Sequence, residues 1–416
     1  MKAALQAHID LSFLAALSST GLNDRERRAA WGRLISREKW KQSRRRGGGR
    51  RRRAASAAAA EARGAGLAAV GGGGAGHGGA EVLQQVRMDV ARAFHWDVCR
   101  AWGAAKRASS LSALALVLDG VFPAAAQQAF PFYVQGCHDV AGALLLSLGP
   151  AQARLALAGL VRGPLRGCVQ SSMEVPCALL GLLPRLLHEA DGALGAALEA
   201  ASPAQDALPH YALPWLITWF AHSLDAFAVV QRLFDAFLLA HPLLPLYASA
   251  ALLTLPGPAA ALHACLRAAP GDEGALFQAC AGLPAATLTS QEAATLLLRR
   301  TNALYALLPP AQLLQPWGAA APQGGPLPRH ARHGAAVAVL QRQWPELLKW
   351  EPVGGVDPRL QGQQALPALA GAGGGEAGAA PPAGGEGRRR QLLLWAAVAV
   401  GVAAVGVAVV RRAGWW

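Results

Sequence analysis

The sequence predicts an all-α protein, and three observations favour this class. Of the 416 residues, 53% are hydrophobic and only 15% are charged, against roughly 25% in a typical soluble domain, so a sizeable apolar core is available. The apolar residues are rich in alanine and leucine, which favour helices. Few stretches alternate apolar and polar residues with period two, and strand-forming residues are sparse outside the C-terminal segment.

The first expected helix lies in residues 23–35 (NDRERRAAWGRLI). Asn23 has the residue type of an N-cap, and Glu26 stands three residues later, where a capping box requires it. Trp31, Leu34 and Ile35 then form one apolar stripe, as on a helix that packs against a core.

A low-complexity insert, residues 43–80, follows this helix. Its first half is rich in arginine and its second half in glycine and alanine, so we expect a disordered segment that cannot pack a core. The basic half could contact anionic lipid or act as a patch of the nuclear-import type, and the residues alone leave these alternatives open.

The net charge of +14 comes from two short segments. Residues 37–63 contain eleven Lys or Arg residues and two Glu residues, and five arginines flank the apolar segment 392–410; the rest of the chain is balanced. This distribution argues against a nucleic-acid-binding fold. Only residues 44–53 would support one.

The next two helices are expected in residues 81–94 and 109–122. In the first, Val82, Val86 and Asp89 recur on one side at spacings of four and three residues. Arg92 follows Asp89 by three residues, so the two side chains are close enough to pair.

The segment 132–139 (FYVQGCHD) gathers polar residues at the start of another expected helix. A metal site, a helix cap and a group directed at a partner all compete as explanations. We disfavour metal ligation by Cys137, His138 and Asp139, because adjacent residues diverge and the sequence offers no evident distant ligand. His138 and Asp139 begin the next helix, where an aspartate can satisfy free backbone amides. The role of Gln135 stays open on these grounds.

Residues 212–252 contain the longest interpretable helical pattern. Pro214 suits a first turn, and a break is expected around His222, Ser223 and Asp225. A new helix follows, on which Arg232 and Asp235 can pair. Its apolar residues recur every three or four positions, which predicts a buried stripe: Phe227, Val230, Leu233 or Phe234, and Phe237.

The C-terminal part of the chain predicts a tether and a membrane anchor. Residues 321–391 are expected to be a partly disordered linker, because Gly, Pro and Ala dominate much of it. Residues 392–410 carry no charge, and a helix of this length would span roughly 28 Å, close to the hydrocarbon thickness of a bilayer. We expect a single-pass tail anchor that leaves the body in the cytosol.

Five blocks of this sequence, in order, resemble the motifs of the TBC domain, the helical domain of Rab GTPase-activating proteins. Residues 86–92 resemble the IxxDxxR motif and Tyr133–Gly136 the YxQ motif. The early WxxL motif and the later WxxTxF and RxxD motifs are matched by Trp31, Trp215, Thr218, Phe220, Arg232 and Asp235.

The resemblance implies a TBC domain in two helical lobes across residues 1–320. It implies that Arg92 supplies charge to the phosphates of GTP on a Rab and that Gln135 orients the attacking water. Asp89 would then hold Arg92, Tyr133 would position the loop, and Gly136 would permit close approach. No cofactor of its own is expected, since GTP and Mg²⁺ arrive on the GTP-bound Rab.

The blocks QGCHDVAGALLL and PWLITWFAHSL are most similar to a tail-anchored subfamily of these proteins. That resemblance implies the endoplasmic reticulum membrane, with the Golgi or another organelle's outer membrane as the alternative, and a Rab of the early secretory pathway. The competing function is a noncatalytic, tail-anchored Rab-binding adaptor.

Overall fold

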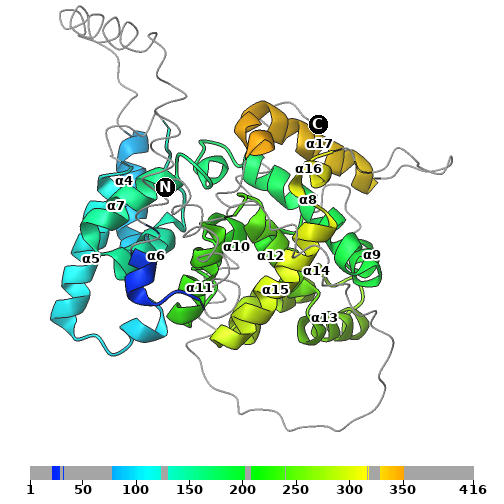
Figure 1. The fold of residues 1–416 in the computed structure, drawn as a ribbon, viewed down its shortest axis with the longest axis horizontal. Helices are drawn as coiled ribbons and strands as arrows, with labels where there is room; N and C mark the ends of the chain where they lie inside the picture. Colours follow the sequence, from blue (N-terminus) through cyan, green and yellow to red (C-terminus); the bar gives the residue numbers. More distant parts are fainter. Residues whose placement is uncertain are drawn as a thin grey trace, which may run out of the picture. The chain divides into compact units, whose positions relative to one another are not determined.

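The computed structural model describes residues 21–28, 31, 77–122, 130–201, 208–238, 240–315, 317 and 328–350. Every regular element within these ranges is a helix, which confirms the predicted all-α class (Figure 1). The chain divides into two compact units, residues 1–358 and 359–416. The second unit, which includes the predicted anchor 392–410, lies outside the described residues.

One group of helices carries the segment between residues 77 and 160. In this group α4 contacts α5 and α6, and α7 contacts α5 and α6 (Figure 1). Leu114, Leu118 and Leu144 lie in its core and are almost completely buried. The members are α4 (His77–Ala91), α5 (Ala104–Asp119), α6 (Cys137–Leu148) and α7 (Pro150–Leu160).

A second group packs around α8 and α12. All ten residues of α12 are buried, so this helix has no amphipathic face and forms the centre of the group. The α-helices of this group are α8 (Glu174–Ala190), α9 (Gly192–Ala200), α10 (Leu213–Ile217), α12 (Leu244–Leu253), α13 (Pro256–Ala268), α14 (Glu273–Thr287), α15 (Gln291–Leu307), α16 (Pro310–Leu313) and α17 (Pro328–Gln343). Short 3₁₀ helices are η1 (Asp97–Cys99), η3 (Arg166–Cys168), η4 (His210–Ala212) and η5 (Pro345–Lys349).

The helix α11 (Phe227–Phe237) joins the two groups, because it contacts α6 on one side and α15 on the other. The apolar stripe predicted for this segment is confirmed: Phe227, Val230, Leu233, Phe234 and Phe237 are all buried. The expected break before α11 is also present, since residues 218–226 are not helical.

The N-terminal segment forms the predicted capping box. The Asn23 side chain accepts a hydrogen bond from the Glu26 backbone at 2.9 Å, and the Glu26 carboxylate accepts one from the Asn23 backbone at 3.0 Å. The helix that begins at Asp24 then directs Trp31 into the core, where its side chain is 1% exposed.

Asp235 on α11 anchors this N-terminal segment to the body. Its carboxylate accepts two hydrogen bonds from Arg27, both at 3.0 Å, and one from the Trp31 indole at 2.8 Å. The predicted pairing of Arg232 with Asp235 is therefore wrong: Arg232 instead packs its side chain against Gly21. Arg27 takes the carboxylate because its planar guanidinium reaches both oxygens from the neighbouring segment.

The compact body extends beyond the boundary at residue 320 that composition predicts. Helix α17 lies within the predicted linker 321–391 and packs against α8, with Val337, Leu340 and Trp344 buried between or beside these elements. The predicted insert 43–80 also ends earlier, since α4 begins at His77. The remainder of the insert lies outside the described residues.

Within the described ranges, no single helix is both long and apolar enough to cross a bilayer. One bent pair, Leu244–Leu253 with Pro256–Ala268, passes on length and composition alone, with a bend of 63°. The first helix of this pair is fully buried in the protein core.

Candidate functional site

Asp89, near the end of α4, is a buried carboxylate that collects hydrogen bonds from three side chains. Arg92 donates to one oxygen at 2.5 Å, and Gln85 donates to the same oxygen at 2.9 Å. Tyr133 donates its hydroxyl to the other oxygen at 2.7 Å. Helical spacing explains Gln85 and Arg92, which stand four residues before and three after Asp89. The contact with Tyr133 crosses 44 residues of sequence.

Arg92 lies just beyond the last residue of α4, and its side chain is 34% exposed. Asp89 thus holds one end of the guanidinium, while about a third of the whole side chain is exposed. Arginine keeps its charge in such surroundings and offers a planar set of donors. This is the arrangement expected of a cation that must be held in place and still reach a docking molecule.

The loop before α6 carries Tyr133, Gln135 and Gly136. The Tyr133 ring packs edge-on against Phe122 with 5.6 Å between centroids, and burial together with the Asp89 charge raises its pKa well above the usual range. Gln135 is half-buried, and its side-chain amide makes no hydrogen bond to any residue that the structure describes. Its donor and acceptor atoms are therefore available to a partner.

Gly136 is the N-cap of α6 and has a φ of 102°, in the left-handed region that favours glycine. An added Cβ would lie 2.7 Å from the Thr218 Cγ2 atom, closer than real Cβ contacts allow. The close approach that glycine permits here is therefore to Thr218 within the chain. The family resemblance implied that Gly136 permits close approach of a docked GTPase. The contact with Thr218 does not test that expectation.

Replacing Gly136 with alanine is expected to lower the free energy of unfolding by about 3 kcal/mol. Backbone strain contributes about 1–2 kcal/mol and overpacking against Thr218 the remainder. Urea unfolding followed by circular dichroism measures the loss. Gly271→Ala is the matched control, because Gly271 has a φ of 78° and no atom within 4 Å of an added Cβ.

Thr218→Ser removes the Cγ2 atom. It therefore separates the backbone strain at position 136 from the steric contact with Thr218. In a double-mutant cycle, Gly136→Ala should cost less in the Thr218→Ser background than in the wild type. An equal cost in both backgrounds would show that contact with Thr218 contributes nothing.

The later motif residues form the support behind this loop. The Thr218 hydroxyl donates to the Pro214 carbonyl at 2.6 Å. Trp215 stacks on Phe220 with 5.7 Å between ring centroids, and both are buried. Phe220 has a φ of 66°, so the turn after α10 stores backbone strain that the aromatic packing must offset.

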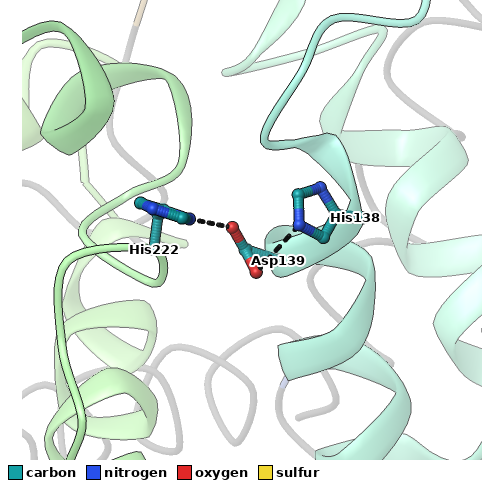
Figure 2. Close-up of side chains that lie close together, drawn as sticks. All are labelled: His138, Asp139 and His222. Atoms are coloured by element: carbon teal, nitrogen blue, oxygen red, sulfur yellow. Dashed lines mark hydrogen bonds and ion pairs between the residues drawn. The ribbon is translucent and has the colours of Figure 1, made fainter. Parts of the chain in front are cut away.

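Asp139, in the first turn of α6, lies among three histidines from separate segments. Figure 2 shows its carboxylate between His138 and His222. His222 Nδ1 lies 2.5 Å from Asp139 Oδ2, and His138 Nε2 lies 3.4 Å from Oδ1. His95 Nδ1 lies 3.8 Å from Oδ1.

The structure corrects two sequence-based expectations about this segment. Asp139 does not cap α6, because no side chain caps that helix and the carboxylate turns toward His222 instead. A distant potential ligand for His138 and Asp139 does exist, since His222 lies 83 residues further along the chain. Cys137 is buried beside them but is not part of this group. The signal in the sequence was a pair of isolated polar histidines, His95 and His222, in apolar surroundings.

Burial controls the protonation of this cluster. Loss of solvent lowers the pKa of His138 and of His95 below the ordinary histidine value. Burial would raise the pKa of Asp139, but His138, His222 and the hydrogen bond from His222 hold it well below its usual range. A neutral imidazole keeps one ring nitrogen free as an acceptor or ligand.

A family model matches the part of the chain that contains these residues. Residues 77–256 match the family model described as the Rab-GTPase-TBC domain, which confirms the predicted resemblance to this domain. The matched range contains Asp89, Arg92, Tyr133 and Gln135.

Individual relatives carry names consistent with this domain. The chain is 33% identical over 166 residues to "GTPase-activating protein gyp10" of Schizosaccharomyces pombe, covering 40% of this chain and 42% of the yeast protein. It is 35% identical over 118 residues to "TBC1 domain family member 20" of Bos taurus and 34% identical over 118 residues to that of Homo sapiens. These two alignments cover 28% of each chain, so each of the three relatives is matched over less than half of its length.

Proposed function

We propose that this protein accelerates GTP hydrolysis by a Rab-family GTPase. The single observation that carries the proposal is the double use of Asp89, which binds Arg92 through one oxygen and Tyr133 through the other. A partly exposed guanidinium is thereby tied to the loop that presents the Gln135 amide. Rab-GTPase-TBC is the domain matched by this part of the chain, and one relative is named a GTPase-activating protein.

Two groups supplied in trans would perform the catalysis. Charge accumulates on the phosphate oxygens as the terminal phosphoryl group leaves, and the Arg92 guanidinium would stabilise it. The Gln135 amide would accept a hydrogen bond from the attacking water and donate to a neighbouring carbonyl, which fixes the direction of attack. The protein would act as an activator without being a hydrolase itself, and it would use the GTP and Mg²⁺ that the Rab holds.

A turnover assay with a panel of GTP-loaded Rabs tests the proposal. The full chain should accelerate phosphate release from at least one Rab, and we expect a Rab of the early secretory pathway to respond most strongly. Gln135→Ala should lower the stimulated rate about 10²-fold, the order of loss when a reacting group is misplaced. No acceleration of any Rab in the panel by a folded protein would contradict the proposal.

A noncatalytic Rab-binding adaptor is the alternative, and the same assay separates it. An adaptor would bind Rab in the GTP form with unchanged hydrolysis, whereas an activator changes the rate. The exposed part of Arg92 and the unoccupied Gln135 amide favour the activator, because binding alone requires neither group.

The proposed site of action is the surface of the endoplasmic reticulum, with residues 392–410 as the membrane-spanning segment. Its support is the run of 19 uncharged residues bracketed by arginines and the similarity to TBC1 domain family member 20. A fluorescent reporter fused to residues 380–416 should label this membrane. Labelling of the Golgi or of mitochondria would contradict the proposed location and leave the proposed stimulation of GTP hydrolysis untouched.

A further inference from the structure

Asp139 is a buried carboxylate whose two oxygens are unequally satisfied. Its Oδ2 atom lies 2.5 Å from His222 Nδ1, whereas the histidine nitrogens nearest Oδ1 are farther away. That oxygen faces His138 Nε2 at 3.4 Å and His95 Nδ1 at 3.8 Å. An ionised carboxylate at 1% exposure is costly unless a cation or several donors compensate it.

The hydrogen bond made by His95 indicates what this oxygen lacks. His95 Nε2 lies 3.2 Å from the Leu224 carbonyl, which only accepts, so Nε2 carries the proton. In the neutral ring, Nδ1 then directs a lone pair toward the Asp139 carboxylate. Two electron pairs that face each other across 3.8 Å define a place for a cation rather than for a further polar side chain.

His138 supplies a second, independent observation. The ring is 1% exposed, and its Nδ1 atom has no hydrogen-bond partner. Nδ1 faces Asp89 Oδ2 at 3.6 Å, while Nε2 faces Asp139. A histidine that binds a metal through one nitrogen typically directs the other toward a carboxylate, and Asp89 occupies that position.

We infer that Asp139, His138 and His222 form a binding site for a divalent transition-metal ion of the zinc type. The donor atoms would be His138 Nε2, His222 Nδ1 and one Asp139 oxygen, which all lie within 4.8 Å of one another (Figure 2). His95 Nδ1 is the nearest candidate for a fourth ligand.

Two of the ligand separations can be compared with those around a tetrahedral ion. Zinc bonds of about 2.0–2.1 Å place neighbouring ligand atoms about 3.3 Å apart. The separation of His138 and Asp139 already agrees with this value, at 3.4 Å. His222 lies 2.5 Å from Asp139 and must withdraw slightly when the ion replaces the shared proton. Its side chain is 15% exposed, against 1% for Asp139, so the adjustment falls on the less buried of the two ligands.

The ligand types select among ions. Imidazole nitrogens with one carboxylate suit zinc, copper, iron or nickel, whereas magnesium and calcium favour sites made of oxygen. Zinc is the ion with which the test begins, because its common sites combine three or four such ligands in tetrahedral geometry.

Equilibrium dialysis of the full chain against Zn²⁺, after treatment with a chelator, tests the site. We expect one tightly bound zinc ion per chain and an increase in the thermal midpoint when zinc is added. His222→Gln should weaken binding at least 100-fold, and Asp139→Asn should do the same. Cobalt bound in place of zinc should give the visible absorption bands of tetrahedral coordination.

His188→Gln is the matched control, because His188 also pairs with a carboxylate, Glu199 at 3.0 Å, but is not part of the proposed site. It should bind zinc as the wild type does. Absence of stoichiometric zinc from the folded wild type would overturn the inference, and so would a His222→Gln variant of unchanged affinity. Circular dichroism shows whether each variant folds. If Asp139→Asn does not fold, the zinc affinity of His222→Gln and the cobalt spectrum of the wild type test the site.

Discussion

Arg92→Ala is expected to lower the stimulated rate of GTP hydrolysis by about 10³-fold or more, since an arginine supplied in trans is worth about 10³–10⁵ in rate. The expected loss is this large because the proposal assigns the stabilisation of phosphate charge to this one guanidinium, which Asp89 holds in place. Single-turnover hydrolysis at saturating protein measures the rate and keeps it independent of affinity. Arg92→Ala also leaves the buried Asp89 carboxylate without this cation, so circular dichroism and urea unfolding should show that the variant is folded before its rate is compared.

Arg92→Lys separates charge from shape. Lysine keeps the positive charge but lacks the planar fork that can contact Asp89 and a phosphate oxygen together, so most of the activity should still be lost. Arg87→Ala is the matched control: Arg87 is an exposed arginine on the same helix, and its removal should change the rate by no more than a few-fold. Full stimulation by Arg92→Ala would exclude Arg92 as the catalytic cation.

Asp235→Ala is expected to lower the free energy of unfolding by about 3–5 kcal/mol, the cost of removing one partner of a buried ion pair. The change leaves the buried Arg27 guanidinium and the Trp31 indole without their shared acceptor. Burial raises the pKa of Asp235 in spite of these donors, so burying this carboxylate costs free energy. Arg27 and Asp235 each compensate the buried charge of the other, and removing either one leaves a buried charge unpaired. Urea unfolding followed by circular dichroism measures the difference.

Asp24→Ala provides the control for this substitution. Asp24 also pairs with Arg27, at 3.0 Å, but its side chain is 71% exposed. Exposed ion pairs contribute little, so a loss below about 1 kcal/mol is expected. If Asp235→Ala costs no more than Asp24→Ala, the buried cluster does not hold the N-terminal segment in place.

Local features of the fold followed from the sequence. The capping box of Asn23 and Glu26 depends on a spacing of three residues, and the stripe on α11 depends on helical periodicity, so both could be predicted. The partner of Asp235 could not be predicted in the same way. Arg232 is close in sequence, whereas Arg27 is 208 residues away and reaches the carboxylate only in the folded chain.

In the candidate site, too, contacts between residues close in sequence could be predicted and contacts between distant residues could not. The contact between Asp89 and Arg92 follows from helical spacing, but the Tyr133 contact and the approach of Gly136 to Thr218 require the tertiary fold. The cluster around Asp139 was missed because His95 and His222 come from two other segments. Helix α17 was assigned to the linker because the glycine and proline around it dominate the composition there.

The attachment of Arg27 and Trp31 to Asp235 makes the N-terminal segment a separable part of the body. These contacts join side chains that are 204 and 208 residues apart in the sequence. The segment is thus held to α11 by side chains that meet only in the folded protein. Two polypeptides made separately, one ending after residue 31 and the other beginning before residue 77, should reassociate as complementing fragments, at the cost of the translational entropy that the intact chain does not lose.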